Sequence, residues 1–252
     1  MSNSNSIHIV AGGKGGCGKS PTAVGIGTWL TQQNPGAKIY SVDTENPTVC
    51  TFASLNTVDV TPIRIGSDGQ RVFDGSLLIP AVTDWEKSEG APVVIDVGTS
   101  AFTGFTGWAV ETDLLGILQD ADKDVVLHLV LVGGQEFSNA IVSADEFANK
   151  AFPKAKVVIW KNEWFAGSVA DPASGKAIED TKFFKALGDR VLGVIAQPKD
   201  EKSKTDVYEQ AWSKGVTALD AQKDPEWDSV RKRILSRYYS QVFEGPLSRI
   251  DW

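Results

Sequence analysis

The sequence of 252 residues predicts an α/β fold with a mostly parallel, twisted sheet and helices on both of its faces. Short apolar runs alternate with helix-like stretches, which is the pattern of strand–helix–strand units. Several runs, such as "VVI" and "VVLHLVLV", are continuously apolar, as expected of strands covered on both faces. The predicted strands are residues 7–10, 38–42, 62–65, 93–95, 125–132, 157–160 and 191–195.

Between these strands, helices are expected at residues 21–33, 139–150, 181–187 and 204–214. A last, amphipathic helix is expected at 225–243, because Asp224 can cap it and Pro225 suits its first position. No linker divides the chain, so residues 7–252 are predicted to form one domain after a polar, disordered stretch at 1–6. The last helix carries one predicted apolar stripe of Trp227, Val230, Ile234, Tyr238 and Val242.

Composition excludes several classes of protein. The net charge of −7 argues against a surface that is basic throughout, although a local basic patch is compatible with it. The two cysteines, Cys17 and Cys50, are too few for a disulfide framework, which favours a reducing, cytoplasmic setting. We expect neither a signal peptide nor a membrane span, since no apolar run approaches the roughly 18 residues that a span needs.

A glycine-rich stretch between the first strand and the first helix carries the clearest chemistry. It fits the phosphate-binding pattern G-x-x-x-x-G-K-[ST], in which glycines let successive amides point at an anion. Lys19 is expected to reach the β- and γ-phosphates of a nucleotide, and the Ser20 hydroxyl to bind Mg²⁺. The sequence therefore predicts a P-loop NTPase domain. The predicted nucleotide contacts in the loop are Gly13, Lys14, Gly15, Gly16, Cys17, Gly18, Lys19 and Ser20.

A second feature supports a magnesium site. The stretch "PVVIDVGTS" is an apolar strand that ends in Asp96. A carboxylate there would bind a water of the Mg²⁺ shell, because Mg²⁺ usually keeps several of its waters.

The loop sequence "KGGCGKS" resembles the deviant Walker A loop, KGGxGK[ST], of the ParA/MinD class of P-loop ATPases. In that class the early lysine, here Lys14, reaches the nucleotide held by a second subunit, which implies an ATP-dependent homodimer. A lysine this early in the loop points away from the phosphates of its own loop, although a solvated surface lysine is the alternative. Pro21 departs from the pattern, since it has no N–H for the α-phosphate, and Thr22 is expected to compensate in part.

The resemblance assigns further residues. Asp43, at the end of the second strand, is expected to hold a Mg²⁺-bound water, and Glu45 to orient the attacking water; the alternative is that both are turn residues. The Gly98 amide is expected to meet the γ-phosphate, with residues 98–105 as switch II. Asn162 is expected to bind the adenine edge and Pro198 to order a loop over the base, although Asn after a strand is often a turn former.

Further blocks look like those of the TraL/StbB-like subgroup, ATPases encoded on plasmids with conjugation or stability genes. They are "VDTENPTVCTF", "VVIDVGTSAF", "VLVGGQ", "VVIWKNEWFAG" and "RVLGVIAQPKDEKSKTDVYE". The resemblance implies a slow ATPase in plasmid positioning, maintenance or conjugal transfer, with a plasmid-encoded partner protein. The alternative is a nucleotide-gated adaptor with negligible hydrolysis. A ligase related to dethiobiotin synthetase ranks last, because it would leave Lys14 without a use.

The last predicted helix is basic. Glu244 is the only acid between Arg231 and Arg249. Non-specific DNA binding and a solvated face are equally compatible with this cluster. Membrane binding is disfavoured, because Gly245-Pro246 interrupts the chain after the helix. The candidate DNA-binding residues are Arg231, Lys232, Arg233 and Arg237.

Cys17 lies inside the phosphate loop near two lysines, so we expect a lowered pKa and block of nucleotide binding by alkylation. The two histidines, His8 and His128, lie in predicted strands without metal-ligand spacing and receive no role.

Overall fold

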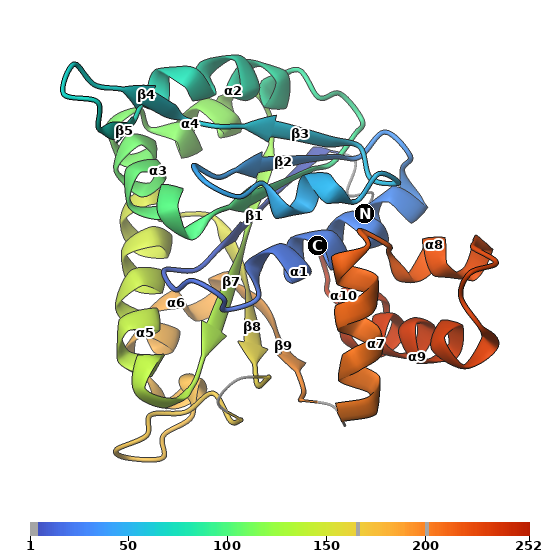
Figure 1. The fold of residues 1–252 in the computed structure, drawn as a ribbon. Helices are drawn as coiled ribbons and strands as arrows, with labels where there is room; N and C mark the ends of the chain where they lie inside the picture. The colour runs from blue at the N-terminus through green and yellow to red at the C-terminus, as the bar shows by residue number, and fades with distance from the viewer. Residues whose placement is uncertain (1–4, 165–166, 200–201) are drawn as a thin grey trace.

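The structure is a computed structural model that describes residues 5–164, 167–199 and 202–252. A seven-stranded sheet runs through its centre in the order β3-β2-β6-β1-β7-β8-β9 (Figure 1). Every neighbouring pair in this sheet is parallel, so the predicted α/β fold is confirmed. The strands are β1 Ser6–Ala11, β2 Lys38–Val42, β3 Thr57–Val60, β6 Val93–Val97, β7 Asp124–Val132, β8 Lys156–Asn162 and β9 Val191–Gln197.

Helices cover both faces of the sheet, with α2 to α5 on one side and α1 with α7 to α10 on the other (Figure 1). All residues of β1 and β6 are buried, which explains why most of their residues are apolar. The helices are α1 Lys19–Gln33, α2 Ile79–Glu86, α3 Thr99–Glu111, α4 Leu114–Asp120, α5 Phe137–Glu146, α6 Lys182–Leu187, α7 Lys202–Ser213, α8 Ala218–Lys223, α9 Ser229–Tyr239 and α10 Gly245–Leu247.

One predicted strand has another place. The run at 62–65 becomes β4 Ile63–Ile65, which pairs with β5 Arg71–Phe73 in a separate antiparallel hairpin. The edge of the central sheet is instead β3, whose sequence "TVDV" is too short and too polar to be distinguished from a loop. The pairing between strands determines which segment joins the central sheet, and local composition does not indicate it.

The predicted last helix at 225–243 begins too early. Helix α9 starts at Ser229, because the Asp228 carboxylate accepts hydrogen bonds from the Val230 and Arg231 amides. Asp224 instead ends α8, and after α9 the chain continues in a wider π-helical turn, Ser240–Glu244. The predicted stripe is also wrong at Val230, which is 66% exposed; Leu235 and Tyr239 face inward instead.

The predicted disordered stretch 1–6 is too long. Ser6 belongs to β1, is buried, and pairs with Asp124 of β7. Asn5 donates a hydrogen bond to the Asp122 carbonyl, and residues 1–4 lie outside the described residues.

The two histidines form a buried polar chain across β1, β7 and β8. The Trp160 indole N–H donates to His128 Nδ1 over 3.0 Å, and His128 Nε2 lies 2.9 Å from His8 Nδ1. His8 Nε2 in turn lies 2.9 Å from Ser6 Oγ. Because an indole only donates, His128 must donate to His8 and His8 to Ser6, with both rings neutral. Burial lowers the pKa of His8 to about 3, in agreement with this arrangement.

None of the described helices is long and apolar enough to cross a membrane.

Candidate functional site

The glycine-rich loop joins the central strand β1 to the buried helix α1. Gly16 and Gly18 have φ values of 71° and 95°, a left-handed conformation that side chains other than glycine rarely adopt. Gly18 is also the residue before α1, which begins at Lys19. The loop therefore ends at a helix N-terminus, where free amides and the helix dipole favour an anion.

Lys19 is held inside this loop. Its ammonium donates to the Lys14 carbonyl over 2.9 Å and to Thr99 Oγ1 over 2.6 Å, and the side chain is almost fully buried. Thr99 is the first residue of α3, just beyond the end of β6. These two bonds fix a positive charge at the loop, and no carboxylate among the described residues is bonded to it.

Asp96 lies beneath the loop at the end of β6 and is 3% exposed. Burial raises the pKa of Asp96 to about 6, the Ser20 hydrogen bond and the Lys19 charge oppose this, and the Asp43 charge raises the pKa further. Its Oδ1 has no hydrogen-bond partner among the described residues. An unpartnered buried carboxylate oxygen beside a hydroxyl and a second carboxylate fits the oxygen ligands and waters that Mg²⁺ prefers.

No group of three or more His, Cys, Asp or Glu side chains in the described part of the chain could hold a metal by itself. A magnesium ion at Ser20, Asp43 and Asp96 would therefore depend on phosphate oxygens and waters for its other ligands.

Asp43 organises the turn that follows β2. Its Oδ1 accepts hydrogen bonds from the Glu45 amide (2.9 Å), the Asn46 amide (3.2 Å) and the Ser100 hydroxyl (2.9 Å). The Asp43 carboxylate thus shapes a turn and also lines the cavity described next, while its role at Mg²⁺ stays a prediction. Glu45 is exposed and lies outside the lining of that cavity.

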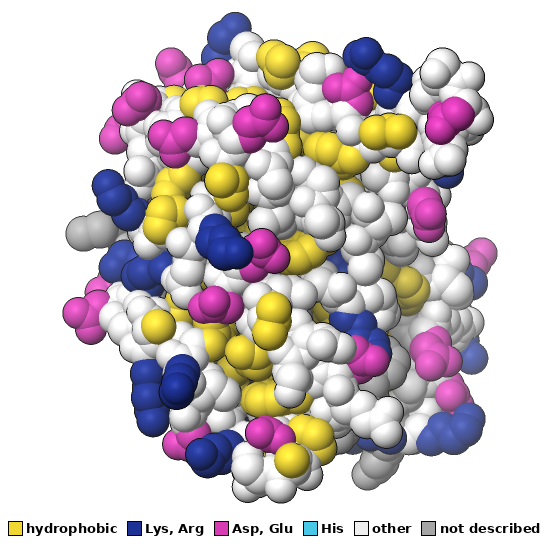
Figure 2. All heavy atoms as spheres, turned by 90° about the vertical axis from the view of Figure 1, so that its left-hand side faces the viewer, with side chains coloured by type: hydrophobic (Ala, Val, Ile, Leu, Met, Phe, Trp, Pro, Cys, Tyr) yellow, Lys and Arg dark blue, Asp and Glu magenta, His cyan; other side chains and the backbone are white. Residues whose placement is uncertain are grey.

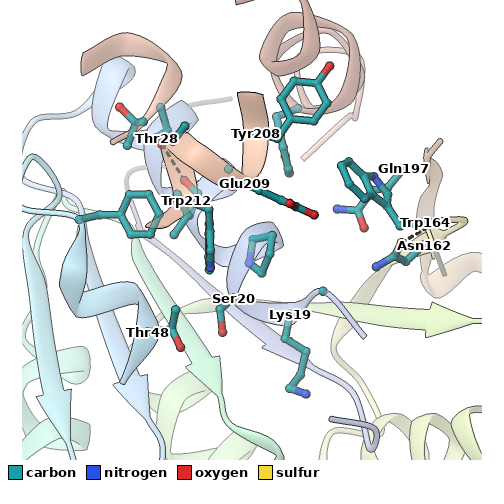
Figure 3. Close-up of a pocket in the computed structure, with 18 of the residues that line it drawn as sticks. Lys19, Ser20, Thr28, Thr48, Asn162, Trp164, Gln197, Tyr208, Glu209 and Trp212 are labelled. Atoms are coloured by element: carbon teal, nitrogen blue, oxygen red, sulfur yellow. Dashed lines mark hydrogen bonds between the residues drawn. The ribbon is translucent and has the colours of Figure 1, made fainter. Parts of the chain in front are cut away.

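A cavity of about 610 Å³ opens from the phosphate loop. In Figure 3, Lys19, Ser20 and Thr48 lie at one end, and Asn162, Trp164, Gln197 and Tyr208 at the other, while Trp212 lies on the side of Ser20 and Thr48. The first end is polar and the second is aromatic. Predicted site residues that line the cavity are Gly16, Cys17, Gly18, Lys19, Ser20, Pro21, Asp43, Gly98 and Asn162.

Several predicted contacts already have partners inside the protein. The Asn162 amide donates to the Cys17 carbonyl over 2.6 Å, and its oxygen accepts from the Trp164 amide. The Gly98 amide donates to the Val42 carbonyl over 2.8 Å. Asn162 therefore anchors the phosphate loop. To contact a nucleotide, the Asn162 side chain or the Gly98 amide must first give up one of these hydrogen bonds. Most of the predicted switch II, residues 98–105, is the start of helix α3.

Pro198 is exposed and lies outside the cavity lining, whereas the preceding Gln197 is buried and lines it. The Gln197 amide donates to Thr22 Oγ1 over 2.9 Å, and that hydroxyl donates to the Gly18 carbonyl over 2.8 Å. Thr22 is fully buried, and its compensation for Pro21 stays a prediction. Pro21 itself is exposed to the cavity.

Lys14 points to a different place from Lys19. Its ammonium pairs with the Glu136 carboxylate over 2.9 Å, and the two side chains remain 41% and 42% exposed. Both residues line a second cavity of about 340 Å³ between the loop and α5, together with Gly13 and Gly15. The pair lowers the pKa of Glu136, through the hydrogen bond from Lys14 first and its charge as well. Surface pairs of this kind are weak and can exchange partners.

The expected lowering of the Cys17 pKa is wrong. Cys17 is 2% exposed, and burial raises the pKa of its thiol, while the nearby Lys19 opposes that rise. Sulfur and ammonium are 3.8 Å apart, but desolvation of the thiolate outweighs this attraction. The sequence placed the thiol in the loop correctly and did not indicate that it faces inward.

The basic residues of α9 are only partly free. Arg231 pairs with Asp228 at 3.3 Å, and the Lys232 ammonium donates to the Gln222 carbonyl over 3.1 Å. Arg233 and Arg237, one helical turn apart, are exposed.

The face shown in Figure 2, the left side of Figure 1, carries charges of both signs interspersed with hydrophobic side chains.

Sequence reasoning missed four residues that shape the site: Thr99, Glu136, Gln197 and Trp212. A polar residue directly after Gly98 was the available signal for Thr99. The other three come from distant parts of the chain, where only the packed structure brings them to the loop.

No family model matches the chain. It is 29% identical over 195 residues to Protein TraL of Escherichia coli, which covers 76% of this chain and 76% of that protein. A second E. coli Protein TraL is 28% identical over 197 residues, with the same coverage. The resemblance to TraL-like proteins that the sequence blocks predict is confirmed, while the deviant character of the loop stays a prediction.

Solved structures are similar at lower identity. The MinD cell division protein of Aquifex aeolicus is 16% identical, with a TM-score of 0.48, over 95% of this chain and 97% of that one. A plasmid partition protein from Borrelia burgdorferi is 16% identical, with a TM-score of 0.40, over 83% and 95% of the two chains.

Proposed function

We propose that this protein is an ATPase that binds ATP with Mg²⁺, hydrolyses it slowly and acts in conjugal transfer, positioning or maintenance of a plasmid. The observation that carries the proposal is the position of Lys19, Ser20 and Asp43 on one cavity at a glycine-rich loop, with the Asp96 carboxylate buried beside the Ser20 hydroxyl. The similarity to TraL proteins supports the plasmid-related role.

In this proposal the loop amides and Lys19 bind the phosphates, while the aromatic end of the cavity takes the base. Magnesium, when bound, would neutralise charge on the phosphate oxygens, with Ser20, Asp43 and Asp96 as the residues that hold it. Catalysis then consists of positioning and electrostatic stabilisation by groups already in place. The almost complete burial of Lys19 supports this, because its charge acts in a poorly screened environment.

Slow hydrolysis follows from the position of Glu45. Its side chain is exposed and lies outside the cavity lining, so the side chain must turn inward, on a backbone that stays in place, before this carboxylate can orient a water. A partner protein that stabilises the inward-turned Glu45 side chain would accelerate hydrolysis.

The proposal includes an ATP-dependent homodimer in which Lys14 contacts the nucleotide of the second subunit. Lys14 supports this because it lies on the opposite side of the loop from the cavity that Lys19 lines. Its present partner, Glu136, is half exposed, so exchange for a phosphate costs little.

Gel filtration with and without a non-hydrolysable ATP analogue tests the dimer. Wild type is expected to dimerise only with the analogue, and Lys14→Ala to stay monomeric while still binding it. The matched control is Lys150→Ala, which removes an exposed lysine paired with Glu146 on the turn after α5. Equal dimerisation of wild type and Lys14→Ala would overturn the role of Lys14.

The exposure of Glu45 also favours a second candidate, a nucleotide-gated adaptor that binds ATP without appreciable hydrolysis and recruits a partner protein. Phosphate release, measured alone and with DNA or a partner, separates the two. For direct DNA contact, Arg233 and Arg237 are the best-placed residues, and salt-dependent binding lost in their double alanine variant is the test.

A further inference from the structure

The β4–β5 hairpin lies outside the central sheet, between β3 and α2 in the chain. In Figure 1 it lies beside α3, at the upper left. Ile65 and Val72 on it are 63% and 53% exposed, so burial of these side chains does not explain why the hairpin is held in place.

The hairpin and the turn after it pack closely on α3. A Cβ atom at Gly104 of α3 would lie 2.4 Å from the Phe73 ring, and one at Gly75 would lie 2.0 Å from the Trp108 ring. The hairpin therefore fits α3 with little free space. This helix starts with Thr99 and Ser100, which hydrogen-bond Lys19 and Asp43 of the candidate site.

Arg71 links the hairpin to the other side of the site. Its guanidinium donates to the Thr44 carbonyl over 2.5 Å. Thr44 is buried and stands between Asp43 and Glu45, in the turn that the Asp43 carboxylate organises from the inside. The turn is thus held from two directions, by Asp43 through its amides and by Arg71 through its carbonyl.

We propose that Arg71 is a positioning residue that holds the turn at residues 43–46 in the geometry required for hydrolysis. This inference rests on the proposed ATPase function. Removal of the guanidinium would free the Thr44 carbonyl and loosen the turn that carries Glu45, whereas Lys19 and the loop amides would keep their places. Hydrolysis would therefore suffer, and nucleotide affinity would not.

Arg64 provides a matched control on the same hairpin. It pairs with Asp74 at 2.6 Å, and its side chain is 68% exposed. In the register, Ile65 is opposite Arg71, so Arg64 belongs to the other face of the hairpin. Loss of Arg64 removes an arginine and one ion pair without any change at Thr44.

The experiment compares wild type, Arg71→Ala, Arg71→Lys and Arg64→Ala. Hydrogen exchange without nucleotide is expected to be about tenfold faster in Arg71→Ala at the Glu45 and Asn46 amides, because a hydrogen bond to a charged group is lost. With ATP, its kcat is expected to fall about tenfold to a hundredfold with the ATP Kd within about threefold, as for misplaced catalytic groups. Arg71→Lys, which keeps a charged donor, recovers part of both effects, and Arg64→Ala matches wild type.

Unchanged exchange at residues 44–48 in Arg71→Ala would overturn the inference, as would an equal effect of Arg64→Ala. A loss of ATP affinity as large as the loss of kcat would also overturn it. If Arg71→Ala does not fold, comparison of Arg71→Lys with Arg64→Ala tests the same inference. Wild type that fails to bind ATP would refute the proposed function alone, and the exchange data would still decide whether Arg71 positions the turn.

Discussion

The two ends of the main cavity are built in different ways. The phosphate end is made of consecutive loop residues between β1 and α1, supported by the buried strands of the sheet. The aromatic end is assembled from Trp164, Gln197 and helices α7 to α9, which have a small hydrophobic core of their own around Trp227 and Leu235. One end depends on local sequence and the other on packing between distant segments.

This difference has a functional consequence. The phosphate end has its charges and amides in place without a ligand, as the bonds of Lys19 to Thr99 and the Lys14 carbonyl indicate. The aromatic end contacts the loop through side chains such as Asn162 and Gln197. We therefore expect the phosphate end to determine whether a nucleotide binds, and the aromatic end to determine how tightly and with which base.

The largest effect is expected for Lys19→Ala. Loss of charge-assisted bonds to two phosphates should weaken ATP binding by about 4 kcal/mol, close to a thousandfold. Calorimetry on wild type, Lys19→Ala and Lys14→Ala checks this, because Lys14 faces the other cavity and its loss should leave monomer affinity within about threefold. Equal losses in the two variants would mean that both lysines contact the same phosphates.

Asp96→Asn is expected to stabilise the protein in the absence of nucleotide. Since burial raises the pKa of Asp96 to about 6, the folded state binds its proton more tightly than the unfolded state does. Its contribution to the free energy of unfolding therefore falls as pH rises from about 4 to about 6 and stays low above that. At pH 7.5 the variant should be more stable than wild type by about 3 kcal/mol, and the difference should vanish near pH 4.

Urea denaturation at both pH values measures this difference, with the exposed Asp206→Asn as the control. A variant that is no more stable than wild type at pH 7.5 would show that the Asp96 carboxylate is not strained by its burial.

Much of the fold and of the phosphate end was predictable from the sequence, because both depend on local patterns. Continuous apolar runs predict buried parallel strands, and β2, for instance, has the predicted limits. The glycine spacing predicts the loop, and Asp96 follows from its place at the end of an apolar strand. In each case neighbouring residues determine the structure without reference to distant ones.

What the sequence could not indicate depends on competition between distant or equivalent groups. Asp224 and Asp228 are both suitable helix caps, and packing of Leu235 and Tyr239 selects the second. The inward direction of Cys17 and the pairing of Lys14 with Glu136 likewise need the folded chain. Gln197 and Trp212 are separated in the sequence, and only the folded chain brings both to the cavity lining.

The aromatic end is tested by Trp212→Ala, compared with Trp212→Phe. The ring centroids of Trp212 and Phe52 are 4.9 Å apart, and Trp212 lines the cavity. Loss of one stacking surface should weaken ATP about tenfold, while tripolyphosphate, which has no base, should bind as in wild type. Phenylalanine should restore most of the affinity. A parallel loss for ATP and tripolyphosphate would place the base elsewhere and attribute the effect to a distorted phosphate end.

The smallest expected effect concerns Cys17, whose rate of reaction reports how far the phosphate end is closed to solvent. Burial raises the pKa of this thiol, so in a Cys50→Ser protein it should react with iodoacetamide at pH 8 at least about tenfold more slowly than a free thiol. Denaturation should restore the ordinary rate, because the unfolded thiol is solvated. The Cys17→Ser protein, with the half-buried Cys50 alone, is the control. A fast reaction of Cys17 that ATP suppresses would contradict this. It would mean that the loop opens readily, that the lysines activate the thiol, and that the phosphate end changes conformation as easily as the aromatic end.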